Sequence, residues 1–427
     1  MNKTKDIFIT GFALFSMFFG AGNLILPPFL GKNAGYSWSL VTLGFFLTAV
    51  IIPILGILAH ARLQGTMYDF GKKVSPIFST TYCLIVYVIS IALPAPRTAS
   101  VTHEMAIQPY FDVSSLVTST LYFMLVFIFV MNRTKVLSLL GRFLTPLIII
   151  ILLAIIFIGM FSATETITPS IFKTPFIDGI LEGYQTFDAI GAVVVGGVLV
   201  ISMNFNKSTS FEQKKELITK AGFIAGLGLL IIYTGLIYNG ALFSSTFTEK
   251  ATRTDVLSSL STQTLGNIGT VFLSILVALA CFTTAVGIIT GTADYFKGLL
   301  KNSKNAYLVT AIVGCVLGVV MGQFDVHYII NIALPALMFI YPITIVLILL
   351  NVIPKKWASA LVFKAVILIT FIFSIPDFLG FIVSKESLTG IKDLIPLANY
   401  HLGWVLPAIL SFIIANLIQK NSSLTKS

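Results

Sequence analysis

Charged residues are scarce in this chain. Asp, Glu, Lys and Arg make up only 10% of its 427 residues, whereas a soluble domain carries about 25%. No polar stretch is long enough to fold alone, which excludes a soluble protein. Hydrophobic residues make up 56% of the chain, with a mean hydropathy of +0.96, and they form long runs from end to end. The composition therefore predicts a polytopic helical protein of the lipid bilayer.

Reactive clusters are also missing. The three cysteines, Cys83, Cys281 and Cys315, lie inside apolar runs and are expected to be packed thiols. The four histidines are scattered near the ends of apolar runs, and none is paired with Cys or Glu at a metal-ligand spacing. The chain has neither a P-loop nor a nucleophile elbow. These absences argue against an enzyme, against direct coupling to ATP and against a covalent cofactor.

The net charge of +10 follows the predicted topology. Hydropathy predicts about twelve spans, and with the N-terminus inside, most of the 27 Lys and Arg residues fall in segments on the inner face. Membrane proteins show this bias on the cytoplasmic side. It therefore places both termini in the cytoplasm and removes the need for a nucleic-acid partner. The predicted spans are residues 7–30, 37–60, 76–96, 115–131, 143–162, 184–204, 221–244, 266–293, 306–322, 328–351, 358–376 and 400–419.

The first predicted span carries an interruption. Residues 7–30 have about the length that crosses a bilayer, and Phe19-Gly20-Ala21-Gly22-Asn23 lies in their middle. Backbone at membrane depth leaves its helical hydrogen bonds only where it is buried in protein or lines a cavity. The interruption therefore predicts a binding site near the midplane, as in transporters with discontinuous helices.

The sixth predicted span carries a second set of glycines, five spans after the first. It runs from Tyr184 through Asp188 and Gly191 to Gly196-Gly197. An odd offset inverts the second unit relative to the first, which is typical of an inverted repeat. The alternative is that these glycines only allow close helix packing, because small residues are common at helix interfaces in lipid. The matched position relative to the first span favours a break.

Two ionisable residues fall at places that allow a function. Asp188 lies beside the second proposed break, where it either contacts a substrate amine, a proton or a cation, or caps the second half of the helix. Arg97 follows Leu93-Pro94-Ala95-Pro96, where the third span ends or distorts. It either faces an outer vestibule or anchors the span by extending to the lipid headgroups.

The eighth predicted span contains two adjacent hydroxyls, Thr283 and Thr284, after Ala280-Cys281-Phe282. Hydroxyls inside a helix usually donate to the carbonyls of the preceding turn. The alternative is a hard cation held by hydroxyls and free backbone carbonyls, because oxygen ligands suit such cations. Broken transmembrane helices supply carbonyls of that kind.

In three stretches the sequence resembles the bacterial branched-chain amino acid:cation symporters (BrnQ-type carriers), and the resemblance covers nearly the whole chain. This family belongs with the transporters of leucine-transporter-like fold. The resemblance implies one all-α transporter domain over residues 1–427. It would have two inverted five-helix repeats with discontinuous helices 1 and 6 (7–162 and 184–351), plus two accessory helices (358–419). The three stretches are Gly11 to Asn23 with Pro27-Pro28, Pro96-Arg97-Thr98-Ala99, and Gly183-Tyr184 through Asp188.

The resemblance also implies binding residues. A sodium ion would take carbonyls near Ser16, Phe19 and Ala280 and the hydroxyls of Thr283 and Thr284. The substrate carboxylate would meet amides at the start of the second half-helix, and its amine would meet carbonyls of the two breaks and Asp188. The expected substrate-binding residues are Gly20, Ala21, Gly22, Asn23, Phe187, Asp188, Ala189, Ile190 and Gly191.

The activity that follows from the resemblance is secondary active import of leucine, isoleucine and valine, coupled to sodium. The location would be the bacterial plasma membrane, crossed several times. Coupling to protons through Asp188 is the nearest alternative, and a channel is a more distant one that lacks a filter motif in this sequence. The sequence gives no indication of an oligomeric state.

Overall fold

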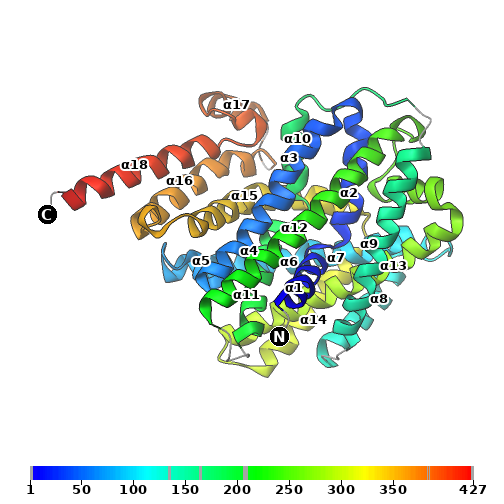
Figure 1. The fold of residues 1–427 in the computed structure, drawn as a ribbon, viewed down its shortest axis with the longest axis horizontal. Coiled ribbons are helices and arrows are strands. Elements are labelled where there is room, and N and C mark those ends of the chain that lie inside the picture. Colours follow the sequence, from blue (N-terminus) through cyan, green and yellow to red (C-terminus); the bar gives the residue numbers. More distant parts are fainter. Residues whose placement is uncertain are drawn as a thin grey trace.

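The computed structural model describes residues 3–132, 136–162, 166–204, 210–381, 383 and 385–424. Within these residues every regular element is a helix (Figure 1). Nine helical stretches of the described chain are long and apolar enough to cross a membrane. The predicted all-α membrane class is therefore confirmed. The count of twelve spans stays a prediction, because α1, α10, α11 and the apolar stretch Val405–Asn421 are too short individually and Ala21–Leu63 counts as a single stretch. Arg133, Lys135, Lys207 and Lys426, assigned to the inner face by the charge pattern, lie outside the described residues.

The first part of the chain corresponds to the first five predicted spans. Three of these spans consist of more than one helical segment: the first is broken at residues 19–20, the second by the π-helical turn η2, and the third at Leu93. The helices are α1 (Lys3–Phe18), α2 (Ala21–Ala34), η1 (Gly35–Ser37), α3 (Trp38–Phe46), η2 (Leu47–Ile51), α4 (Ile52–Leu63), α5 (Met67–Gly71), α6 (Pro76–Ala92), α7 (Pro94–Thr102), η3 (His103–Ile107), α8 (Ser115–Asn132) and α9 (Val136–Ser162).

The second part of the chain contains longer helices. The longest, α13, has a non-helical residue at Gly266, where φ is +71°, so its first segment leads at a kink into the eighth predicted span. The helices are α10 (Pro175–Tyr184), α11 (Asp188–Asn204), α12 (Phe211–Leu242), η4 (Ser244–Thr246), α13 (Arg253–Leu299), α14 (Lys304–Gly322), α15 (Val326–Val352), η5 (Lys355–Trp357), α16 (Ala360–Leu379), α17 (Lys385–Leu394), η6 (Ala398–Tyr400) and α18 (Val405–Leu424).

The first span is broken at the predicted place. Helix α1 ends at Phe18 and α2 begins at Ala21, and Phe19 and Gly20 lie between them without helical assignment. Gly20 is the N-cap of α2 with extended backbone angles. Its amide donates to Asn23 Oδ1 at 3.3 Å, which satisfies one amide at the start of the second half-helix.

The sixth span is also broken, beside Asp188 as predicted. Helix α10 ends at Tyr184 and α11 begins at Asp188, and Phe187 in the break has a φ of +63°. Gly196 instead packs on α4, where an added Cβ would lie 2.3 Å from His60 Cδ2. For this glycine the packing interpretation is correct. The span also begins earlier than predicted, at Pro175 rather than 184, because Asp178 and Glu182 lower the hydropathy of its first half.

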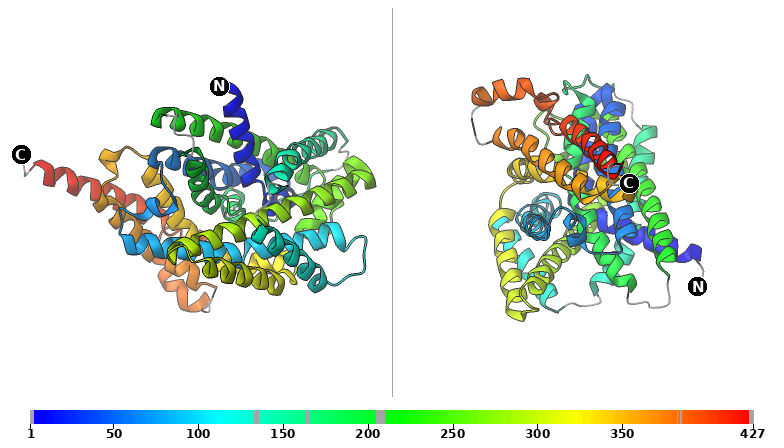
Figure 2. Two further views of the ribbon diagram at one scale, coloured as in Figure 1. Left: turned by 90° about the horizontal axis from the view of Figure 1, so that it is seen from below. Right: turned by 90° about the vertical axis from the view of Figure 1, so that its left-hand side faces the viewer.

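The broken helices lie at the centre of the bundle. Helix α2 packs against α12 and α13, while α11 packs against α4. The contact between α2 and α12 is close enough to require glycine on both sides. A Cβ at Gly31 would lie 1.8 Å from Ile237 O, and one at Gly240 would lie 2.0 Å from Pro28 O. Helices α16 and α18 are peripheral, and the C-terminal end of α18 projects from the body of the molecule (Figures 1 and 2).

Candidate substrate cavity and cation pocket

A cavity of about 160 Å³ lies where the two breaks meet. One buried water needs roughly 10–15 Å³ of such space, so the cavity is large enough for a small organic molecule. Its walls come from α1, α2, α6, α7, the second break, α11 and α13. The lining residues are Met17, Phe18, Gly20, Ala21, Gly22, Asn23, Tyr87, Ser90, Pro94, Arg97, Thr98, Thr186, Phe187, Asp188, Ile190, Gly191, Val194, Thr284, Gly287, Ile288, Gly291 and Thr292.

The start of α2 forms one wall of the cavity. Gly20, Ala21, Gly22 and Asn23 all line it, as the sequence predicted. The first amides of a helix have no acceptor within that helix, and the helix dipole adds partial positive charge at this end. A negatively charged group in the cavity would therefore be stabilised beside α2.

A buried polar network connects the two breaks. Asn23 Nδ2 donates to Asp188 Oδ2 at 2.7 Å and also contacts the hydroxyl of Tyr233. The Tyr233 hydroxyl lies 3.3 Å from the same Asp188 oxygen. Asp188 is 4% exposed and lines the cavity, so one side chain both links the two breaks and presents a carboxyl group to a ligand. Tyr233, on α12, carried no signal in the sequence.

The second break supplies most of its predicted residues. Phe187, Asp188, Ile190 and Gly191 line the cavity. Ala189 is not among the lining residues, and its part in binding stays a prediction. Its side chain is fully buried, and its amide donates to the Tyr341 hydroxyl at 3.4 Å.

A second, smaller space lies beside the cavity and measures about 20 Å³, room for a single water or ion. It brings together Ser16, Phe19, Ala280 and Thr283, four of the five residues predicted to bind a cation. The remaining walls come from Leu144, Thr145 and Ile148 of α9. Thr145 Oγ1 donates to Ser16 Oγ at 2.7 Å. Sequence reasoning missed this threonine because nothing local connects the fifth span to the first.

Thr284 is the predicted cation residue that the structure places elsewhere. It lines the large cavity, whereas Thr283 lines the small pocket. Neighbouring helical residues point in different directions, so the two hydroxyls serve two spaces. Both donate to Ala280 O, at 3.0 Å for Thr283 and 2.9 Å for Thr284, so the back-bonding interpretation is confirmed for both. A hydroxyl that donates this way still has lone pairs that can accept a cation.

Arg97 is buried, and both sequence interpretations of it are wrong. It is 4% exposed and lies in the cavity wall rather than at the headgroups or in an outer vestibule. Helix α6 ends at Ala92, and the turn at Leu93-Pro94 directs α7 inward. Arg97 Nη1 donates to Gln185 O at 2.8 Å, and its Cζ lies 5.3 Å from the centre of the Phe187 ring. The prolines around Arg97 were the available signal for this change of direction.

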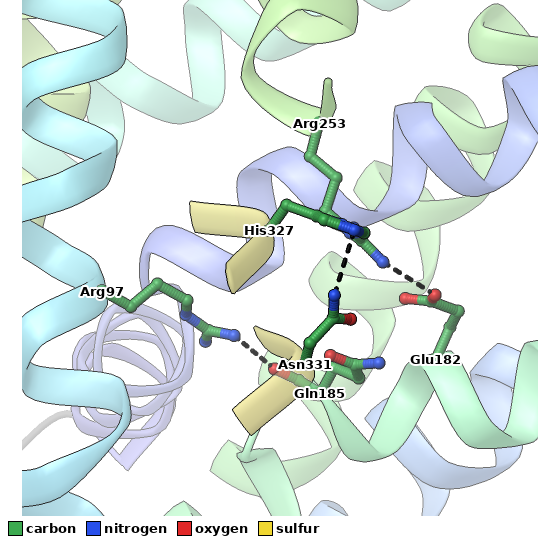
Figure 3. A network of polar contacts seen from close by, with 6 residues as sticks. All are labelled: Arg97, Glu182, Gln185, Arg253, His327 and Asn331. Carbon is green, nitrogen blue, oxygen red and sulfur yellow. Dashed lines mark hydrogen bonds and ion pairs between the residues drawn. The ribbon is translucent and has the colours of Figure 1, made fainter. Parts of the chain in front are cut away.

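A polar network lies beside the second break (Figure 3). Arg253, at the start of α13, forms an ion pair with Glu182 of α10 at 3.1 Å. Arg253 Nη1 also lies 3.1 Å from His327 Nδ1 on α15, and Asn331 Nδ2 lies 3.0 Å from His327 Nε2. Three elements are thereby tied together above the second break.

The cavity itself extends in the other direction. Gly191 and Val194 of α11, and Gly287 and Gly291 of α13, lie further along these helices, away from the Arg253–Glu182 pair. Glu104 adds two hydrogen bonds near this pair, because it accepts from Thr254 Oγ1 at 2.5 Å and from the Val326 amide at 2.8 Å. These contacts link η3, α10, α13 and α15 on the side that the charge pattern predicts to face outward.

Comparison with known proteins gives a family match over nearly the whole chain. The family model described as branched-chain amino acid transport protein matches residues 3–422. The branched-chain amino acid permease BraB of Bacillus subtilis is 33% identical over 96% of this chain and 94% of the relative. The branched-chain amino acid transport system 2 carrier protein of Pseudomonas aeruginosa is 31% identical over 97% of this chain and 96% of the relative.

Solved structures share the fold at low identity. The inward-facing conformation of Mhp1 matches with a TM-score of 0.58 at 12% identity, over 97% of this chain and 91% of that chain. MhsT in complex with L-phenylalanine matches with a TM-score of 0.57 at 15% identity, over 95% and 97%. These similarities confirm the expected leucine-transporter-like fold.

Proposed function

This chain belongs to the branched-chain amino acid transport protein family, and from that premise we propose that it is a sodium-coupled symporter. It imports leucine, isoleucine and valine across the bacterial plasma membrane, with both termini in the cytoplasm. The single observation that carries the proposal is the cavity between two broken helices, which combines polar backbone ends with an apolar wall. A permease needs such a cavity near the midplane.

The cavity suits a zwitterion with an aliphatic side chain. The start of α2 favours a carboxylate, and Asp188 favours an ammonium group. These groups offset the cost of taking both charges out of water. Met17, Phe18 and Ile288 add apolar surface for the side chain. One methylene in such a pocket is worth only about 1–3 kcal/mol, so leucine, isoleucine and valine are expected to compete with one another.

The small pocket supports sodium as the coupling ion. Its walls offer hydroxyls from Ser16, Thr145 and Thr283, and backbone carbonyls are available where α1 ends. Uncharged oxygen donors suit a hard monovalent cation. A membrane potential of ~100 mV would add about 2.3 kcal/mol per charge moved inward. The ion gradient and the potential would together drive accumulation.

Proton coupling is the second candidate, and one observation favours it. Asp188 is a buried carboxylate that lines the cavity and accepts hydrogen bonds from Asn23 and Tyr233. A carboxylate in that position is able to carry a proton along with the substrate. Sodium coupling is preferred because the small pocket offers a separate site that needs no titration of Asp188.

Uptake by proteoliposomes distinguishes the candidates. Purified protein would be reconstituted and supplied with radiolabelled leucine under an inward sodium gradient, or under an inward proton gradient with choline in place of sodium. Sodium-driven accumulation above the external concentration, reduced by excess isoleucine or valine but not by lysine, is the expected result. Accumulation under the proton gradient alone would overturn sodium coupling. Equilibration without accumulation under either gradient would indicate a channel.

A further inference from the structure

Arg97 is a buried cation that forms no ion pair with the described part of the chain. The residue is 4% exposed, and within the described residues no carboxylate oxygen lies within 4.0 Å of its guanidinium. Its Nε is buried without a hydrogen-bond partner. Burying a charge is costly unless it is paired and hydrogen-bonded. The bond to Gln185 O and the contact with the Phe187 ring offset only part of that cost.

The guanidinium lies beside the positive end of α2. An added Cβ at Gly22 would lie 2.5 Å from Arg97 Nη2, so the arginine approaches this helix closely because residue 22 has no side chain. Both Arg97 and Gly22 line the cavity. Two independent sources of positive potential, a formal charge and a helix start, therefore meet on one wall. The carboxyl group of Asp188 lines the same cavity.

We propose that Arg97 binds the α-carboxylate of the transported amino acid, together with the first amides of α2. The inference rests on the proposed function in one respect, that the cavity holds a zwitterionic amino acid. An arginine fork recognises a carboxylate with two parallel hydrogen bonds. The carboxylate completes the pairing that the folded chain leaves open, and Asp188 takes the ammonium end. The opposite charges thereby fix the orientation of the substrate.

The contact to Gln185 gives this recognition a second effect. Arg97 Nη1 is bonded to a carbonyl of the second break, while Nη2 lies next to the start of α2. A carboxylate bound to Arg97 is therefore connected to both breaks through one side chain. The cavity requires a carboxylate on its ligand, and an amine with the same aliphatic chain is a poor substitute.

The test compares leucine with leucinamide, which keeps the ammonium and the side chain but lacks the carboxylate charge. Binding to the purified full-length protein is measured in sodium, by displacement of radiolabelled leucine or by the ligand-dependent rise in melting temperature. The wild-type protein is expected to bind leucinamide at least ~10-fold more weakly than leucine, because a charge-assisted hydrogen bond contributes the difference.

Variants of Arg97 test whether this side chain binds the carboxylate. Arg97→Gln is expected to weaken leucine binding about 10- to 100-fold while it changes leucinamide binding little, so the two affinities converge. Arg97→Lys keeps the charge but loses the fork, and is expected to restore part of the preference for leucine. Arg62→Gln, at an exposed arginine of α4, is the matched control and leaves both affinities unchanged.

Several results would overturn the proposal. Equal binding of leucine and leucinamide by the wild type would do so without any variant. Equal weakening of both ligands in Arg97→Gln and Arg97→Lys would mean that Arg97 only holds the Gln185 carbonyl. Leucine binding that depends on chloride, and loses this dependence in Arg97→Gln, would make an inorganic anion the partner.

These experiments distinguish a failure of the Arg97 proposal from a failure of the proposed transport function. If the wild type binds another amino acid but not leucine, the substrate class is wrong, and the comparison is repeated with that amino acid and its amide. If leucine binds through Arg97 but sodium drives no uptake, only the coupling is wrong. If no amino acid binds at all, both proposals fail.

Discussion

Thr283 and Thr284 provide a controlled test of the cation pocket. The two hydroxyls make the same structural bond, to Ala280 O, at 3.0 Å and 2.9 Å. They differ in the space they face, because Thr283 lines the small pocket and Thr284 lines the large cavity. Replacement by alanine therefore removes an equivalent hydrogen bond in each variant, and only Thr283→Ala removes an oxygen from the pocket.

The expected magnitude follows from the loss of one oxygen ligand. A hydrogen bond or contact to a charged group contributes about 1.5–3 kcal/mol, and each 1.4 kcal/mol is a factor of ten in affinity. Thr283→Ala should therefore raise the sodium concentration for half-maximal leucine uptake roughly 10- to 150-fold. Thr284→Ala should change this concentration less than about threefold. Thr283→Ser restores the oxygen without the methyl group and should return the sodium dependence close to that of the wild type.

The assay is initial leucine uptake in proteoliposomes as a function of external sodium, with choline keeping the ionic strength constant. Thermal unfolding of each purified variant without sodium controls for a general loss of stability. The cation assignment is refuted if Thr283→Ala and Thr284→Ala shift the sodium dependence equally, because only the shared bond to Ala280 would then matter. It is also refuted if Thr283→Ala leaves sodium dependence at its original value.

Two further changes test the polar network around Arg253 and the close approach of Arg97 to the start of α2. Glu182→Gln removes the charged partner of the mostly buried Arg253. Breaking a buried ion pair is strongly destabilising. Amide hydrogen exchange should therefore become faster in α10 (Pro175–Tyr184) but not in α14 (Lys304–Gly322). The exposed pair Lys215–Glu212 is the control, because Glu212→Gln should leave hydrogen exchange in both helices unchanged. Unchanged exchange of α10 in Glu182→Gln would show that the ion pair with Arg253 does not stabilise this helix. Gly22→Ala should weaken leucine binding at least ~10-fold, because its Cβ would lie 2.5 Å from Arg97 Nη2 and would move the guanidinium away from the proposed carboxylate position. Gly298→Ala, where a Cβ meets nothing within 4 Å, should leave leucine binding unchanged, and equal effects of the two glycine variants would contradict the steric argument.

The two breaks illustrate how far the sequence can be interpreted. The first was predictable because two glycines and an asparagine interrupt an apolar run, and these residues favour non-helical backbone. The second was predicted in the correct span and beside Asp188, and the break lies directly before that residue. Its positive φ belongs to Phe187, a residue type that rarely adopts this conformation. Tertiary packing imposes this backbone conformation, and the local sequence does not predict it.

The site residues divide in the same way. Residues beside a break, such as Gly20 and Asp188, were found because chain position alone places them at the cavity. Thr145 and Tyr233 were missed because they reach the site only through packing of α9 and α12. Arg97 was misassigned because an arginine near the end of an apolar run usually extends to the headgroups. Only the inward turn before α7 reveals its position.

The arrangement of the two spaces supplies a physical route for coupling. Ser16 and Phe19 border the cation pocket, and the next residues, Gly20 to Gly22, border the substrate cavity. A cation that fixes the end of α1 would therefore also fix the start of α2, where the carboxylate is proposed to bind. Each ligand would then favour the arrangement of residues 16–22 that the other ligand needs, so each would strengthen the binding of the other. Linkage requires the two effects on affinity to be equal.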